Sequence, residues 1–436
     1  MGQRGAARAG VVLRRALRAV GIDTVYGAAL PGGPTCLASG SCAMVLAAAH
    51  RRVLATRAVV HLGHGQLLEP GSPEEAAGEV AIDTDLAESA VAAFGPGGSG
   101  RLVFAGDLEA DIPDPGTVWV APAGDRWIEP DDALVAALRA ARAPVVLAGP
   151  GVLAQGETAG LHGLAAAGSL GVLNTWGAKG IFHWRSRHHL ATGGLQERDF
   201  ELGGLGEADL IVATGLDPWE SPADRWRLAA AIEVPPAALA PLAERWARPV
   251  QDIPQPPLRT GLAAVTQQGW TRTGSPVAPS LATRNYGSVL GRSGLLAADP
   301  GVAGYWAART FSTTEAGAVL VPGHPDAAGL AVAAAFVARR DRPSRPVLAV
   351  VDQLSPLIRE LLELAASAGV AVPVEVWDGE GPPLDGDAHL RRLEMLVAVD
   401  RPEPVSLTVA GDQLAAMVSV AGPVVAWGGI SGGEGS

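Results

Sequence analysis

The sequence predicts an α/β protein with parallel, doubly wound sheets, and the stretch from residue 144 to 218 carries the clearest signal. Three apolar runs lie there, PVVLA, GVLNT and LIVAT, and such runs are typical of buried parallel strands. Glycine follows each run, where backbone can approach a ligand closely. A helical pattern from Glu157 to Ala167 separates the first two runs. Strand and helix in alternation indicate an open α/β sheet.

Composition limits the partners and the compartment. The 436 residues include 33 basic and 45 acidic side chains, a net charge of −12, which disfavours nucleic acid and anionic membranes as partners. Arg14, Arg15 and Arg18 interrupt the first apolar stretch, and no segment has the roughly 18 apolar residues of a membrane span. Cys36 and Cys42 are too few for a disulfide framework. We therefore expect a cytoplasmic protein without a signal peptide.

Proline- and glycine-rich segments divide the chain into three predicted domains. Residues 116–127 form one linker, and residues 235–257, which contain QDIPQPP, form a second, extended one. A chain of this length has room for two or three domains with buried cores. We expect three α/β domains, at residues 1–115, 116–260 and 261–436.

The order of PVVLAGPGV, TWGAKGIF, ATGGL and ADLIVATGLDPWE resembles the central domain of thiamine-diphosphate enzymes of the acetolactate synthase type. The first domain, in which a helix precedes GIDTVYG, resembles the family's pyrimidine-binding domain in shortened form. Residues 275–436, with LLAADPGVAGYW, resemble its diphosphate-binding domain. The resemblance implies thiamine diphosphate and Mg²⁺ as cofactors, 2-oxo acids as substrates and a homodimer or tetramer, because the family's cofactor lies between subunits.

The first domain departs from the family pattern at the turn before its alanine-rich helix. Active members carry a glutamate there, which protonates the aminopyrimidine of the cofactor. This turn reads ASGSC, and Gly40 stands at the glutamate position. Without a carboxylate the reactive ylid forms slowly. The resemblance therefore gives this chain no catalytic residue.

The metal motif departs as well. Active relatives end one strand with Gly-Asp-Gly and supply an asparagine later, because these oxygens hold Mg²⁺ and the glycine amides meet the diphosphate. Here the strand ends Val351-Asp352-Gln353, and Asp378, 26 residues after Asp352, takes the asparagine's place. We expect the two aspartates to face each other across neighbouring strand ends. A divalent cation, an arginine or a shared proton can each compensate their repulsion.

Other positions for the cofactor follow from the resemblance. The turn Gly323-His324-Pro325-Asp326 precedes a small-residue helix, and it is also a well-formed helix cap. The positions that the resemblance assigns to cofactor binding are Gly323, His324, Gly329, Gln353 and Gly379, with Asp352 and Asp378 for the metal.

Two further patterns are ambiguous. His61 and His64 in VVHLGHG have the spacing of a metal or acid–base pair, but no carboxylate or third ligand is near them in sequence, which favours polar residues at a strand end. Lys179 is the only lysine, so it is the only side chain that could form a lysine Schiff base.

Three functions remain open at this point. The first is an active thiamine-diphosphate enzyme acting on 2-oxo acids. The second is a degenerate member, a pseudoenzyme with a binding, regulatory or assembly role. The third is a nucleotide-binding protein that uses Gly149-Pro150-Gly151 and Thr214-Gly215, although the spacing of a dinucleotide motif is missing. The eroded cofactor motifs favour the second, and we expect thiamine diphosphate and Mg²⁺ to bind weakly or not at all.

Overall fold

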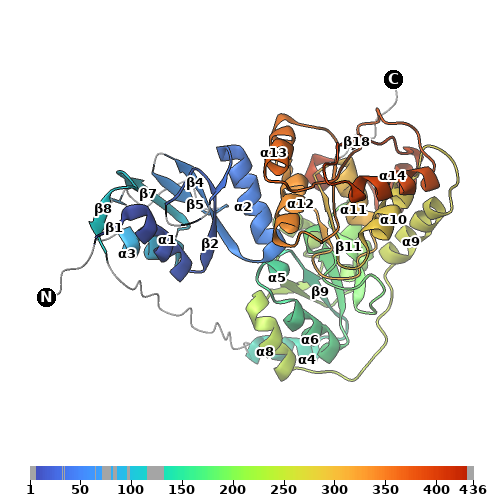
Figure 1. Cartoon of the computed structure of the whole chain (residues 1–436). Helices are drawn as coiled ribbons and strands as arrows, with labels where there is room; N and C mark the ends of the chain where they lie inside the picture. The colour runs from blue at the N-terminus through green and yellow to red at the C-terminus, as the bar shows by residue number, and fades with distance from the viewer. Residues whose placement is uncertain are drawn as a thin grey trace. The chain divides into compact units, whose positions relative to one another are not determined.

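The structure is a computed structural model, and it describes residues 6–31, 33, 35–63, 65–70, 80–81, 86–95, 99–114 and 132–429. The chain forms two compact units, Met1–Arg126 and Trp127–Ser436 (Figure 1). The linker predicted at residues 116–127 lies outside the described residues. Among the described residues, no helix combines the length and the apolar character that crossing a bilayer requires.

The first unit is built on a six-stranded mixed sheet with strand order β3-β2-β4-β5-β7-β6. Its elements are β1 Ala6–Arg8, α1 Ala9–Ala19, β2 Ile22–Gly27, β3 Cys36–Leu37, α2 Gly40–Leu54, β4 Arg57–Gly63, β5 Gln66–Leu68, β6 Val80–Ala81, α3 Leu86–Phe94, β7 Arg101–Ala105 and β8 Asp111–Pro113.

In this unit the sequence did not reveal the antiparallel part of the sheet. β5 runs antiparallel to both β4 and β7, while β2 pairs in parallel with β3 and β4. β4 ends at Gly63 and β5 begins at Gln66. This connection is too short for a parallel pair, because parallel strands need a crossover of a dozen residues or more. Gly63 and Gly65 make this tight reversal, each with a φ of +77°. A Cβ at Gly65 would lie 1.8 Å from the Phe104 carbonyl oxygen.

The second unit contains two five-stranded sheets in which every pair is parallel, so the predicted α/β fold with parallel sheets is confirmed. The first sheet has the order β11-β10-β9-β12-β13 and the second the order β15-β14-β16-β17-β18. The strands are β9 Pro144–Ala148, β10 Gly171–Thr175, β11 His189–Gly193, β12 Leu210–Thr214, β13 Ala230–Glu233, β14 Leu295–Ala298, β15 Val319–Leu320, β16 Val347–Val351, β17 Val374–Val376 and β18 Val405–Ser406.

Helices pack against both sheets of this unit, and Figure 1 shows α4, α6 and α8 together beside β9. The helices are α4 Asp132–Ala140, α5 Gly151–Ala154, α6 Thr158–Gly168, α7 Ala223–Trp226, α8 Leu239–Arg245, α9 Pro257–Trp270, α10 Pro279–Leu290, α11 Val302–Thr310, α12 Leu330–Asp341, α13 Pro356–Ser367, α14 Gly386–Ala398 and α15 Asp412–Ala421.

One continuous apolar core joins the two sheets of the second unit. It includes Leu147 and Ile211 from the first sheet and Leu296 and Leu348 from the second, all fully buried. The predicted boundary near residue 260 falls within α9. The division into three domains stays a prediction, because the two sheets lie in one compact unit.

Candidate functional site

The resemblance places the diphosphate at the carboxyl edge of the second parallel sheet. Two aspartates there already bind the amides at the starts of the neighbouring helices. Asp299 follows β14, and its carboxylate accepts hydrogen bonds from the amides of Gly329 (2.6 Å) and Ala331 (2.8 Å), at the start of α12. Asp352 follows β16 and accepts from Val302 (2.7 Å) and Ala303 (2.8 Å), at the start of α11. These are the amides that bind anions at a helix N-terminus.

The charge of Asp352 affects the protonation of Asp299. Burial and the charge of Asp352 raise the pKa of Asp299, the amides of Ala331 and Gly329 lower it, and the net pKa is about 6. Burial also raises the pKa of Asp352, against the lowering effect of its two amide bonds. The like-charged neighbour of Asp352 is thus Asp299, which follows β14.

The second predicted metal residue has partners of its own. Asp378 follows β17, the parallel neighbour of β16, and accepts hydrogen bonds from the Ser406 hydroxyl (2.6 Å) and the Glu380 amide (3.0 Å). Gln353 and Gly379 are exposed. Among the described residues, no group of three or more His, Cys, Asp or Glu side chains is placed to hold a metal ion. The metal assignment stays a prediction without support from this geometry.

The predicted Gly323-His324 turn lies against acidic residues of the loop that follows β12 in the first parallel sheet. A Cβ at Gly323 would lie 2.9 Å from Glu220 Oε1 and 3.3 Å from Asp217 Oδ2. His324 packs edge-on against Trp219, with ring centroids 4.4 Å apart. The approach to this turn is therefore negatively charged, which opposes a diphosphate.

In the first unit the turn before α2 lacks an acid, as expected. Gly40 opens the helix, Ser39 caps it by accepting from the Cys42 amide at 3.4 Å, and the first turn has no acidic residue. His61 Nδ1 lies 3.1 Å from the carbonyl oxygens of Ala28 and Ala29, and burial lowers its pKa. His64 lies outside the described residues.

The two glycine turns that were candidates for nucleotide binding are hydrogen-bonded to each other. The Gly149 amide donates to the Thr214 carbonyl (2.9 Å) and the Gly151 amide to the Gly215 carbonyl (2.8 Å). A Cβ at Gly149 would lie 2.3 Å from the Gly215 oxygen. Because these two amides are already bonded, they do not form a phosphate cradle.

We predict that Gly301→Ala destabilises the protein. Gly301 has a φ of +126°, and its Cβ would lie 2.1 Å from Asp352 Oδ2. Backbone strain contributes about 1–3 kcal/mol, and the clash also displaces the carboxylate that caps α11. Urea denaturation measures the loss. Gly317→Ala is the control, because Gly317 has a φ of +74° and nothing within 4 Å of its Cβ. Equal losses in both variants would contradict a role for the Asp352 contact.

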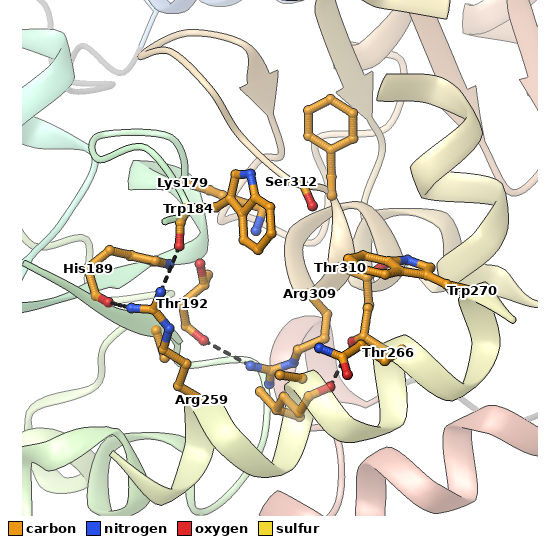
Figure 2. A pocket seen from close by; sticks show the side chains of 15 residues that line it. Lys179, Trp184, His189, Thr192, Arg259, Thr266, Trp270, Arg309, Thr310 and Ser312 are labelled. Carbon is orange, nitrogen blue, oxygen red and sulfur yellow. Dashed lines mark hydrogen bonds between the residues drawn. The ribbon is translucent and has the colours of Figure 1, made fainter. Parts of the chain in front are cut away.

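A second locus is a cavity of about 150 Å³ in the second unit, which the sequence did not predict (Figure 2). It is bounded by β11, α9, the end of α11 and the loop after residue 178. Its lining is basic and aromatic, with no aspartate or glutamate: Lys179, Trp184, His189, Ala191, Thr192, Arg259, Leu262, Ala263, Thr266, Gln267, Trp270, Arg309, Thr310, Phe311 and Ser312.

The two arginines of the cavity are held by protein groups. Arg309 donates to both Asp199 oxygens at 3.0 and 2.7 Å and to the Thr192 carbonyl at 2.9 Å. Burial lowers the pKa of Arg309 and Asp199 raises it, and the ion pair prevails, so the guanidinium stays charged. Arg259 donates to the carbonyls of Trp184, at 2.9 Å, and His189 (Figure 2).

Lys179 differs from both arginines. It is 7% exposed, and within the described part of the chain no hydrogen bond or ion pair engages its ammonium group. Burial, and then the charge of Arg309, lower its pKa to about 7. Burial and the charges of Lys179 and Arg259 lower the pKa of His189 to about 3, so that ring stays neutral. The one signal of this site in the sequence is that Lys179 is the only lysine.

Comparison with known proteins identifies the region around the first parallel sheet. Residues 132–233 match the family model described as thiamine pyrophosphate enzyme, central domain. A search of curated proteins found no match. The matched residues run from α4 to the end of β13 and contain every strand of that sheet. This segment of the chain is therefore similar to the central domain of thiamine pyrophosphate enzymes.

Proposed function

We propose that this protein is a degenerate relative of the acetolactate synthase type of thiamine-diphosphate enzyme, with a non-catalytic binding, regulatory or assembly role. One observation carries the proposal. The amides at the starts of α11 and α12, where a diphosphate would be bound, donate to Asp352 and Asp299.

The residues present do not fit thiamine diphosphate with Mg²⁺. A diphosphate would have to displace the carboxylates of the buried Asp299 and the partly buried Asp352 from their amides or lie beside them, and like charges at such short range repel strongly. Val351 and Gln353 flank Asp352 at the two positions where the family's glycines would give the backbone room. Asp352 itself is engaged with two amides rather than open to a cation.

Titration calorimetry with thiamine diphosphate and Mg²⁺ tests the proposal. We expect no binding at micromolar concentrations and no turnover of pyruvate, because the anion site is filled by the protein's own charges. Asp352→Asn serves as the matched variant in thermal melting with millimolar Mg²⁺ or Ca²⁺. A cation-dependent rise in melting temperature that this substitution abolishes would establish a metal site at Asp352. Micromolar cofactor binding with turnover of pyruvate would establish an active enzyme instead.

The same proposal includes a homodimer or tetramer in the cytoplasm. The support for the oligomer is the family resemblance, in which neighbouring subunits meet around the cofactor, and the support for the cytoplasm is the low cysteine count. Light scattering coupled to size exclusion separates a monomer of 44.3 kDa from these assemblies.

A further inference from the structure

We propose that the cavity around Lys179 binds a small oxyanion, a carboxylate or a phosphate group, with the Lys179 ammonium as its charged anchor. This inference concerns a different place from the closed helix ends. It holds whether or not the thiamine-diphosphate proposal is correct.

The charge balance of the cavity is the first argument. Lys179, Arg259 and Arg309 line it, and none of the lining residues that the structure describes is acidic. Asp199 compensates Arg309 through two hydrogen bonds. Arg259 bonds to backbone carbonyls, which carry no full charge. Positive charge therefore remains in a buried site without a counter-ion, and an anion is the ligand that balances it.

Unfilled hydrogen-bonding capacity is the second argument. Lys179 is more than nine-tenths buried, and among the described residues nothing accepts a hydrogen bond from its ammonium. His189 Nδ1 is buried and has no hydrogen-bond partner. Buried polar groups are nearly always satisfied, so two unsatisfied groups at one cavity call for an explanation. A bound oxyanion accepts hydrogen bonds from the Lys179 ammonium and from His189 Nδ1 when the neutral ring carries its one hydrogen there.

The walls set the size of the ligand. A volume of about 150 Å³ suits a single small molecule, whereas sites for larger ligands are typically 300 Å³ or more. The lining includes three uncharged polar residues, Thr192, Gln267 and Ser312. The rings of Trp184 and Trp270 form apolar walls (Figure 2). The cavity therefore fits an oxyanion on a short carbon or phosphate body rather than a nucleotide.

Protonation couples to binding at this site. The groups that face Lys179 are Arg309 on α11, Arg259 on α9 and the neutral His189 on β11, and they disfavour its charged form. An anion selects the protonated amine and raises its pKa. Affinity should therefore fall as pH rises through the free value of about 7, by up to about tenfold between pH 6 and pH 8 if only the ammonium form binds.

Titration calorimetry of the full chain with sodium phosphate and, separately, sodium acetate tests the site at constant ionic strength, with chloride as the reference anion. We expect binding of one equivalent of phosphate or acetate, with proton uptake at pH 7. A response to acetate alone identifies a carboxylate ligand, and a response to phosphate identifies a phosphate ligand. Failure of both at millimolar concentration, or equal binding of chloride, would overturn the proposal.

Two variants locate the binding. Lys179→Met should weaken it at least tenfold without lowering the melting temperature, because it removes a buried, uncompensated charge. Arg185→Met removes an exposed positive charge from the same loop and should bind like the wild type. Equal affinity in Lys179→Met and the wild type would refute the anchor. If Lys179→Met does not fold, acetate affinity of the wild type at pH 6 and pH 8 decides, because acetate stays ionised and a flat profile excludes Lys179.

Discussion

Replacing Asp199 by alanine is expected to lower the free energy of unfolding by about 3–5 kcal/mol, the usual cost of breaking a buried ion pair by removing one partner. The Asp199 and Arg309 side chains are 0% and 1% exposed, and they join through two hydrogen bonds. Without Asp199 the buried guanidinium loses its counter-ion and keeps its bond to the Thr192 carbonyl and its contact with Tyr305. Urea denaturation followed by circular dichroism measures the loss.

The neighbouring pair Arg198–Glu201 supplies the control. These two side chains are 50% and 53% exposed, and water and salt screen their attraction. Glu201→Ala should leave the urea midpoint nearly unchanged. If both substitutions lower the midpoint equally, the burial of Asp199 does not determine its contribution, and the prediction is wrong.

Glu375→Gln is expected to produce the second large effect, a loss of about 3 kcal/mol or more. Glu375 is fully buried in the middle of β17. Its carboxylate accepts a hydrogen bond from the Tyr286 hydroxyl, lies 3.2 and 3.3 Å from His389 Nε2, and accepts from Arg392 at 3.2 Å. A neutral amide cannot balance Arg392, and its nitrogen presents hydrogens to groups that are themselves donors.

This effect should depend on pH in a defined direction. Burial raises the pKa of Glu375, but the hydrogen bond and charge of His389, with Tyr286 and Arg392, lower it more, so the pKa lies below 4.5. A depressed carboxyl pKa adds stability above the unfolded value that is lost as pH falls through the folded one. The gap in unfolding free energy between wild type and Glu375→Gln should be constant near neutrality and narrow below about pH 4.5. A gap that widens in acid would contradict this assignment.

The parallel strands were predictable because their apolar runs leave few alternatives. Residues 144–148, 171–175 and 210–214 form strands where the sequence predicted them. Helix limits also agreed closely, as with α6, predicted from residue 157 and observed from Thr158. The resemblance based on these runs is supported by the family match over residues 132–233. Local patterning was sufficient for these features, since each depends on residues close together in the chain.

The rest depends on partners that are distant in sequence. Asp199 and Arg309 are 110 positions apart, and Glu375 and Tyr286 are 89 apart. No periodicity connects such residues, so neither buried cluster could be anticipated. The same is true of Asp299, whose carboxylate reaches amides 30 and 32 positions away. Lys179 was noticed for its rarity, but the cavity appears only when α9 and α11 pack against β11.

The exchange of caps between β14 and β16 has a consequence for local opening. Asp299 ends β14 but holds the start of α12, and Asp352 ends β16 but holds the start of α11, the helix that follows β14. Fraying of either helix therefore leaves the carboxylate that caps it without its two amide donors. The free energy of opening one helix includes the loss at the other strand's end. The start of α11 thus depends on the end of β16 and the start of α12 on the end of β14, although β15 lies between the two helices in the chain.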